Sequence, residues 1–188
     1  EARYDFGKNF GGVTERSNAW CSCVLERMGL PVYFSSDPGG ILCLEGELAA
    51  LLSEEEIKKA LSGTVFLASD AAKILIDRGF GEYLGVDVHP WTGAQPSTER
   101  LFVNNTKTKV QQKYQELVPI TENVTEDSAV YHSVDEVHFD YLFPGTTVYK
   151  NSFGGTAVVF CGTPITEFTY VQAFSFLNES RKLQLVKI

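Results

Sequence analysis

The sequence predicts an α/β fold in which a parallel sheet lies between two layers of helices and is followed by a strand-rich second half. Three observations lead to this prediction. Residues 53–88 read as a helix, a buried strand and a second helix in immediate succession. Shorter strand and helix patterns precede this stretch, and from residue 101 onward the runs are β-branched or alternate with a period of two. Strands that alternate with short helices are typical of parallel sheets covered by helices.

The first helix of the central stretch has clear boundary signals. Ser53 and Glu56, three residues apart, form a capping box, and Leu52 and Ile57 stand where a hydrophobic staple places them. Gly63 is expected to end the helix in the left-handed conformation, which glycine adopts without a steric penalty. We therefore expect a short helix that begins at Ser53 and ends at Gly63.

A strand and a second helix follow directly. Residues 64–68 form an apolar run that is too short for a helix and contains the β-branched and aromatic residues of a strand covered on both faces. Ser69 and Asp70 are expected to cap a helix that runs through Arg78 and ends at Gly79. The order of helix, strand and helix indicates a crossover between parallel strands.

The residues before this stretch continue the same pattern. We expect a loop or edge strand at residues 1–12, a helix at 18–28, a strand at 31–34, a strand at 41–44 and a short helix at 46–52. A helix that runs straight into a strand is half of a strand–helix–strand unit. These elements extend the predicted parallel sheet toward the N-terminus.

The second half predicts hairpins and a final helix. Pro144-Gly145 and Gly154-Gly155 are expected to break the strands, because both residue types favour turns. A helix is expected at residues 170–185. The predicted strands are 109–118, 129–134, 137–143, 146–149 and 156–160.

Composition limits the classes of function. With 188 residues, of which 44% are hydrophobic, the chain is expected to form a single globular domain spanning residues 1–188. A net charge of −8 without a basic cluster argues against nucleic acid and anionic membrane surfaces as partners. There is no apolar run approaching the roughly 20 residues of a membrane span and no signal-peptide pattern. Because the sequence opens on Glu1, we expect it to be a piece of a longer protein.

The four cysteines predict buried thiols. Cys21, Cys23, Cys43 and Cys161 lack the paired spacing of a zinc site. Cysteine is among the residues most often found in protein interiors, and unpaired thiols favour a reducing compartment such as the cytoplasm. The sequence thus predicts no metal site and no cofactor.

Polar residues follow the predicted parallel strands and are the candidates for ligand binding. Ligands of open parallel sheets lie beyond the carboxyl ends of the strands. The candidates at these ends are Glu45, Ser69, Asp70 and Thr163. Local hydrogen bonding alone also favours such residues at helix starts and turns.

No catalytic residue is predicted. A cysteine nucleophile needs a base and a sharp turn flanked by glycines. Cys43 lies between Leu42 and Leu44, and Cys161 precedes Gly162 but has no histidine and carboxylate that can be assigned to it. His132 and His138 fall within predicted strands.

An aromatic group offers a further surface. Tyr83, Trp91 and Phe102, together with His89, either stack on a sugar or close an edge of the core or an interface.

Three segments together suggest a family. NAWCSCVLERMGLPVYF, GILCLEGELAALLSEEEIKKALSGTVFLASDAAKILIDRGFGEYLGV and FGGTAVVFCGTP resemble the class I glutamine amidotransferase-like domains of some bacterial glycoside hydrolases. The trimerisation domain of certain beta-galactosidases is similar. The resemblance implies a three-layer, flavodoxin-like sheet. Because the sequence lacks both the Gly-x-Cys-x-Gly elbow and the later His-x-Glu of active members, it implies a degenerate, non-catalytic domain.

The expected function is that of an accessory domain in a larger bacterial carbohydrate-active protein. It would serve subunit assembly or form a wall of a neighbouring active site, with the rest of its own polypeptide, or a further copy in a homo-oligomer, as partner. One alternative is a module that binds a small molecule or a carbohydrate, or a cryptic hydrolase, through the strand-end residues. Another is a purely structural interaction domain.

Overall fold

The computed structural model describes residues 41–44, 46–103, 105, 107–109 and 114–162. The elements predicted at 1–12, 18–28, 31–34 and 170–185 lie outside the described residues, as do Glu45, Thr163, Cys21 and Cys23.

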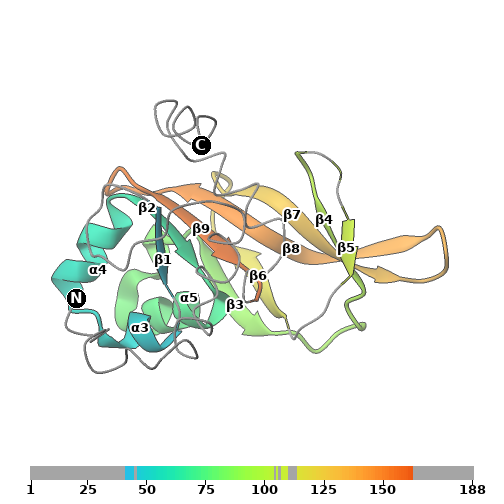
Figure 1. Ribbon diagram of the computed structural model, residues 1–188, viewed down its shortest axis with the longest axis horizontal. Helices are drawn as coiled ribbons and strands as arrows, with labels where there is room; N and C mark the ends of the chain where they lie inside the picture. The colour runs from blue at the N-terminus through green and yellow to red at the C-terminus, as the bar shows by residue number, and fades with distance from the viewer. Residues whose placement is uncertain (1–40, 45, 104, 106, 110–113, 163–188) are drawn as a thin grey trace, which may run out of the picture.

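The described strands form a seven-stranded mixed sheet in the order β1-β2-β9-β8-β7-β4-β5 and a two-stranded ribbon, β3-β6 (Figure 1). β1, β2 and β9 run parallel to one another, and the pairs from β9 to β5 are antiparallel. The prediction of a mixed α/β fold with a strand-rich second half is confirmed, but the sheet is parallel only at one side. The strands are β1 (Ile41–Leu44), β2 (Thr64–Leu67), β3 (Val86–Pro90), β4 (Thr98–Leu101), β5 (Lys107–Lys109), β6 (Gln115–Pro119), β7 (Thr125–Ser133), β8 (Phe139–Lys150) and β9 (Thr156–Phe160).

The described helices and the β3-β6 ribbon share one hydrophobic core with the sheet. Ile57 of α4 and Leu75 of α5 belong to the same buried cluster as Val65 of β2, Val88 of β3 and Phe143 of β8. Phe66 lies on the opposite face of β2 and is also fully buried, as the apolar run predicted. The helical elements are α3 (Gly46–Leu51), α4 (Glu54–Leu61), α5 (Ser69–Leu75), a π-helical turn η2 (Ile76–Phe80) and a 3₁₀ turn η3 (Gly81–Tyr83). None of the described helices is long and apolar enough to cross a membrane.

The predicted start of α4 is confirmed, and its predicted end is wrong. The Ser53 hydroxyl accepts a hydrogen bond from the Glu56 N–H at 3.3 Å, and the Glu56 carboxylate accepts from the Ser53 N–H at 2.8 Å. Gly63 does not have a positive φ; the helix ends at Ser62 with right-handed geometry. The reason is tertiary, because Gly63 leads directly into β2 and its carbonyl accepts a 2.9 Å hydrogen bond from the Thr156 N–H.

The second helix begins one residue earlier than a Ser69 cap would require. Ala68 occupies the N-cap position without a side-chain hydrogen bond, and Ser69 is the first helical residue. Ser69 is buried, so its side chain lies in the core environment and not at a solvated cap. Gly79 ends the helical segment at a φ of 90°, as predicted.

β8 passes through Pro144 and Gly145 without the predicted break. Pro144 pairs with Ala129 where the β7 register is irregular, and proline is tolerated at such irregularities because it lacks only the N–H. The hairpin turn at Gly154 is confirmed by its φ of 83°. β3 and β4 were not predicted, and the strand predicted at 109–118 is divided between β5 and β6.

Candidate functional site

Hydrogen bonds join the ends of β1, β2 and β9 at the edge of the sheet where the sequence predicted a ligand site. Beyond the carboxyl ends of the parallel strands, the Ala68 N–H donates to the Leu44 carbonyl at 3.3 Å and the Ser69 N–H donates to the Gly162 carbonyl at 3.4 Å. These two hydrogen bonds join the ends of β1, β2 and β9. The structure therefore brings the described ends of these three strands together, with Ser69 and Asp70 directly after β2.

Asp70 and Ser69 differ in their surroundings at this edge. Asp70 is exposed, and one of its carboxylate oxygens accepts a 2.7 Å hydrogen bond from the Ala71 N–H. The carboxylate lies close to Gly46, where an added Cβ would stand 2.6 Å from Asp70 Oδ2. Ser69 is buried beside Gly162. Glu45 and Thr163 lie outside the described residues.

Cys161 has the properties of a core residue. It follows β9 directly, its backbone N–H donates to the Gly145 carbonyl at 2.8 Å, and its carbonyl accepts from the Gln115 N–H at 2.7 Å. Burial raises the pKa of the Cys161 thiol well above its usual value, and the charge of Glu99 acts in the same direction. The predicted burial is confirmed for Cys161, whereas Cys43 is only half-buried.

The described histidines contact carboxylates or carbonyls near their own strands. His89 Nε2 lies 3.0 Å from Asp87 Oδ2 within β3, and His132 Nδ1 lies 2.8 Å from the Gln95 carbonyl. His138 was predicted to lie in a strand, but it precedes β8, and its Nδ1 lies 2.7 Å from Asp135 Oδ2. Among the described residues, no group of three His, Cys, Asp or Glu side chains is arranged to hold a metal ion.

The members of the predicted aromatic group differ in their surroundings. Tyr83 stacks on Phe153 with ring centroids 4.2 Å apart, and Trp91 packs against Phe143 at 4.8 Å. Both side chains pack against the hydrophobic core. Phe102 is exposed in the turn after β4. The interpretation that these aromatics close the edge of the core is supported for Tyr83 and Trp91.

A buried polar network that the sequence did not reveal lies in the antiparallel half. Glu99 of β4 is 7% exposed. Its carboxyl group accepts hydrogen bonds from the Tyr114 hydroxyl at 3.1 Å and the Ser128 hydroxyl at 2.7 Å, and Ser128 is 3.1 Å from the Thr146 hydroxyl. Burial raises the pKa of Glu99, and the hydrogen bonds from Ser128 and Tyr114 oppose that shift. The network joins β4, β7 and β8 of the sheet to the residue that precedes β6.

Gly145 leaves room for this network. A Cβ at this position would lie 2.6 Å from Ser128 Oγ and 2.7 Å from Glu99 Oε1. A proline followed by a glycine inside a β-branched run was the available signal, since glycine in a strand often marks a close approach of other groups. The segment around Glu99 has two charged residues among four and was not recognised as a strand.

Chemically, the described groups favour hydrogen bonding over covalent catalysis. The Cys161 thiol at the end of β9 is buried, and the buried Glu99 carboxyl group accepts hydrogen bonds from two hydroxyl groups. Comparison with family models, curated proteins and solved structures finds no match to this chain.

Proposed function

We propose that this chain is a non-catalytic accessory domain of a larger carbohydrate-active protein, a bacterial glycoside hydrolase in the first instance, and that it serves assembly or forms a wall of the active site. The observation that carries the non-catalytic part is the environment of Cys161. A working amidotransferase-like domain needs an exposed thiolate at a strand end. The strand-end thiol here is buried and protonated at neutral pH. The link to glycoside hydrolases is supported by the three sequence segments described above.

Turnover assays test this proposal. We expect the purified chain to show neither glutaminase nor glycosidase turnover, and Cys161→Ala to behave as the wild type in both assays. Cys161→Ser keeps nearly the same volume and controls for packing defects. Turnover by the wild type that disappears in both variants would contradict the proposal, because it would make Cys161 a reactive group in spite of its burial.

A second candidate function is the binding of a small molecule or carbohydrate at the carboxyl edge of β1, β2 and β9. The observation that favours it is the exposed Asp70 carboxylate beside Gly46, at an edge where two hydrogen bonds tie the three strand ends together. Carboxylates next to backbone turns are suited to hydroxyl groups of sugars, because each oxygen accepts two hydrogen bonds.

A thermal-shift screen of sugars and nucleotides separates the two functions. A ligand at 100 times its Kd stabilises the native state by about 2.7 kcal/mol. If the edge binds sugars, Asp70→Asn should abolish the shift while the unliganded melting temperature stays unchanged. Asp77→Asn is the matched control, because Asp77 follows α5 and is bonded to Lys73 at 2.7 Å on the exposed surface. A screen without any shift leaves the accessory role as the function that fits.

A further inference from the structure

The hairpin of β7 and β8 forms an arm that extends past the other strands of the sheet (Figure 1). We call residues 131–141 the arm; its base is anchored at Tyr131, which pairs with Thr98 of β4. Tyr131 pairs with Tyr141 and Ser133 with Phe139, and residues 134–138 make the tip. The arm is convex and projects from the body, so it does not offer the concave pocket that small molecules require.

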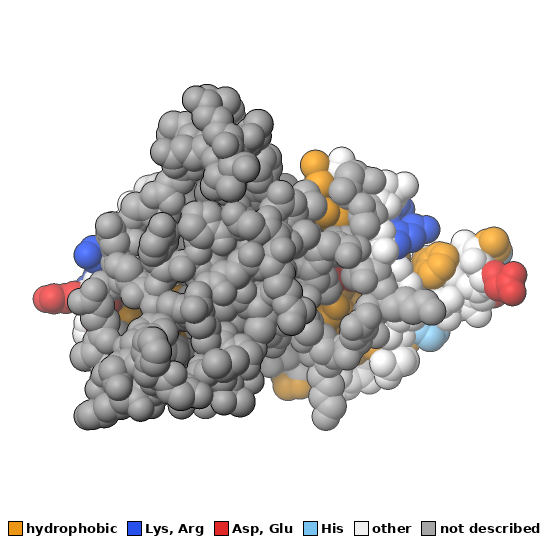
Figure 2. Space-filling model, in the orientation of Figure 1, with side chains coloured by type: hydrophobic (Ala, Val, Ile, Leu, Met, Phe, Trp, Pro, Cys, Tyr) orange, Lys and Arg blue, Asp and Glu red, His pale blue; other side chains and the backbone are white. Residues whose placement is uncertain are grey.

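Large apolar side chains are exposed on this arm. The exposed fractions are 57% for Val134, 75% for Val137, 38% for Phe139 and 50% for Tyr141. Figure 2 shows apolar and acidic groups together at its far end. Single exposed apolar residues are ordinary, whereas a cluster within one short projection marks an interaction site.

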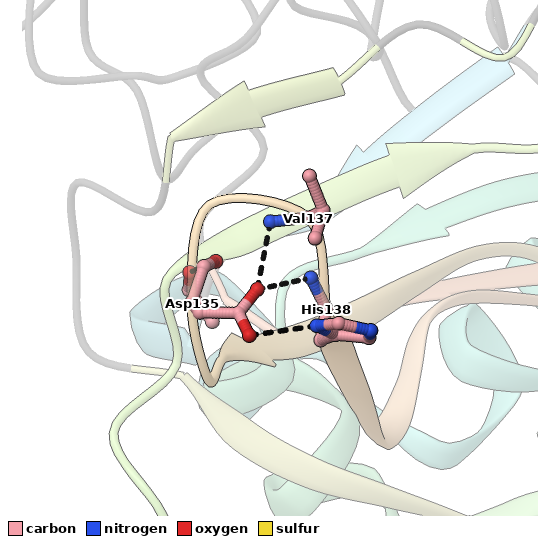
Figure 3. A network of polar contacts seen from close by, with 4 residues as sticks. Asp135, Val137 and His138 are labelled. Carbon is pink, nitrogen blue, oxygen red and sulfur yellow. Dashed lines mark hydrogen bonds and ion pairs between the residues drawn. The ribbon is translucent and has the colours of Figure 1, made fainter.

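Asp135 makes three polar contacts within the tip (Figure 3). Its Oδ1 accepts hydrogen bonds from the Val137 N–H at 2.9 Å and the His138 N–H at 2.8 Å, and its Oδ2 lies 2.7 Å from His138 Nδ1. The Val134 N–H donates to the His138 carbonyl at 3.0 Å. These bonds also lower the pKa of Asp135, with the Val137 N–H as the largest cause. A tip ordered before binding loses less conformational entropy when it docks.

The negative charge of the arm limits the classes of partner that it can bind. Asp135, Glu136 and Asp140 are exposed on the arm, and residues 131–141 contain no Lys or Arg. Anionic membranes and nucleic acids repel such a surface. A second copy of the chain would bring the same acidic arm and a further net charge of −8, and like charges placed together oppose association.

We propose that the arm docks, with Val134 and Val137 leading, into an apolar pocket rimmed by Lys or Arg on a protein surface of another domain or subunit. This inference rests on the proposed assembly role and names the element that performs it. The valines supply the buried apolar contact, and the surrounding carboxylates supply orientation and long-range attraction. Lys107, which lies 5.2 Å from the Phe139 ring centroid, belongs to this chain and shields the base of the arm.

Photo-crosslinking from the arm tests the proposal. Benzoylphenylalanine is placed at Glu136 of the full-length protein in the cells that make it, and the adducts are mapped to residues by mass spectrometry. The matched control carries the same probe at Glu122, another exposed glutamate, in the turn between β6 and β7. That turn and the tip lie at opposite ends of β7, which spans roughly 30 Å at about 3.3 Å per residue.

We expect a protein adduct from position 136 that is absent from position 122 and maps to apolar residues flanked by Lys or Arg. Adding Val137→Asp should lower its yield about tenfold or more, the equivalent of about 1.4 kcal/mol, whereas Val137→Ile should preserve it. Asp140→Lys should also lower it. Adducts only between copies of the chain, adducts to lipid, or equal adducts from both positions would overturn the proposal.

The two proposals fail separately. Catalytic turnover by the chain would remove the accessory role and leave the crosslinking result standing. A missing adduct from position 136 would remove the arm as the docking element and leave the turnover result standing.

Discussion

Because the Glu99 carboxyl group is buried, we expect the free energy of unfolding to depend on pH. Its pKa is raised in the folded state from the ordinary value of 4.5 because burial disfavours the charged form. The contribution of the neutral carboxyl group to stability is therefore fully present at a pH below its pKa in the unfolded chain. It is lost as the pH rises through its pKa in the folded protein. Within that window the free energy of unfolding falls by up to about 1.4 kcal/mol per pH unit.

Glu99→Gln should remove this dependence, because the amide is neutral at every pH and keeps a similar shape. Its oxygen can accept from Ser128, and its NH₂ group can donate to the Tyr114 oxygen. Glu99→Ala, in contrast, removes the acceptor of the hydrogen bonds from the Tyr114 and Ser128 hydroxyl groups and leaves a cavity in a buried network. Each buried polar group left unsatisfied costs about 1 to 3 kcal/mol, so we expect a loss of roughly 2 to 5 kcal/mol in total.

Urea unfolding followed by circular dichroism between pH 5 and 9 measures the effect. The difference between Glu99→Gln and the wild type should grow with pH in favour of the variant. Glu122→Gln, at an exposed glutamate in a turn, should run parallel to the wild type at every pH. If the curves of the wild type and Glu99→Gln also stay parallel, the carboxyl is not held neutral by burial and the reasoning is wrong.

Three further predictions concern a backbone clash, a helix cap and a buried thiol. An added Cβ at Gly155 would lie 2.1 Å from the Leu61 carbonyl oxygen, so Gly155→Ala should cost several kcal/mol or prevent folding in an expression and denaturation test. A Cβ at Gly154 would meet no atom within 4 Å, but the residue has a φ of 83°. Gly154→Ala should therefore cost only about 1 to 2 kcal/mol of left-handed strain. Equal losses of stability in the Gly154 and Gly155 variants would refute the clash at Gly155. Ser53→Ala should destabilise the protein by about 1 kcal/mol through loss of the cap, and urea unfolding at neutral pH that shows no change would mean that the cap is dispensable. Cys161 should resist iodoacetamide at pH 8 in the folded protein and react in 6 M guanidinium, as mass spectrometry of its peptide would show; rapid labelling of the native state would contradict its burial.

Signals confined to a few residues were read correctly from the sequence. The capping box of Ser53 and Glu56, the buried strand β2 and the glycine turn at Gly79 are local features, so their neighbours in the chain were enough. The same holds for the meeting of strand ends near Ser69, because parallel strands in one sheet place their carboxyl ends at one edge.

Predictions that ignored distant segments were wrong. Gly63 does not adopt the left-handed conformation that its helix would allow, because its carbonyl pairs with Thr156, 93 residues away by their numbers. Pro144 and Gly145 remain in β8 because the irregular register of β7 accommodates a missing N–H, and because the space beside Gly145 is filled by Glu99 and Ser128.

The sequence by itself determined the α/β class, the central helix–strand–helix order and the burial of Cys161, since hydrophobic pattern, caps and turn residues act over one or two turns of chain. Only the tertiary structure decided the change from parallel to antiparallel pairing at β9, the enclosure of Glu99 between hydroxyl groups, and the projection of an apolar, acidic arm. These features depend on contacts between residues far apart in the chain. The free energy that stabilises these features comes from burial and hydrogen bonding between segments, which form only when the sheet assembles.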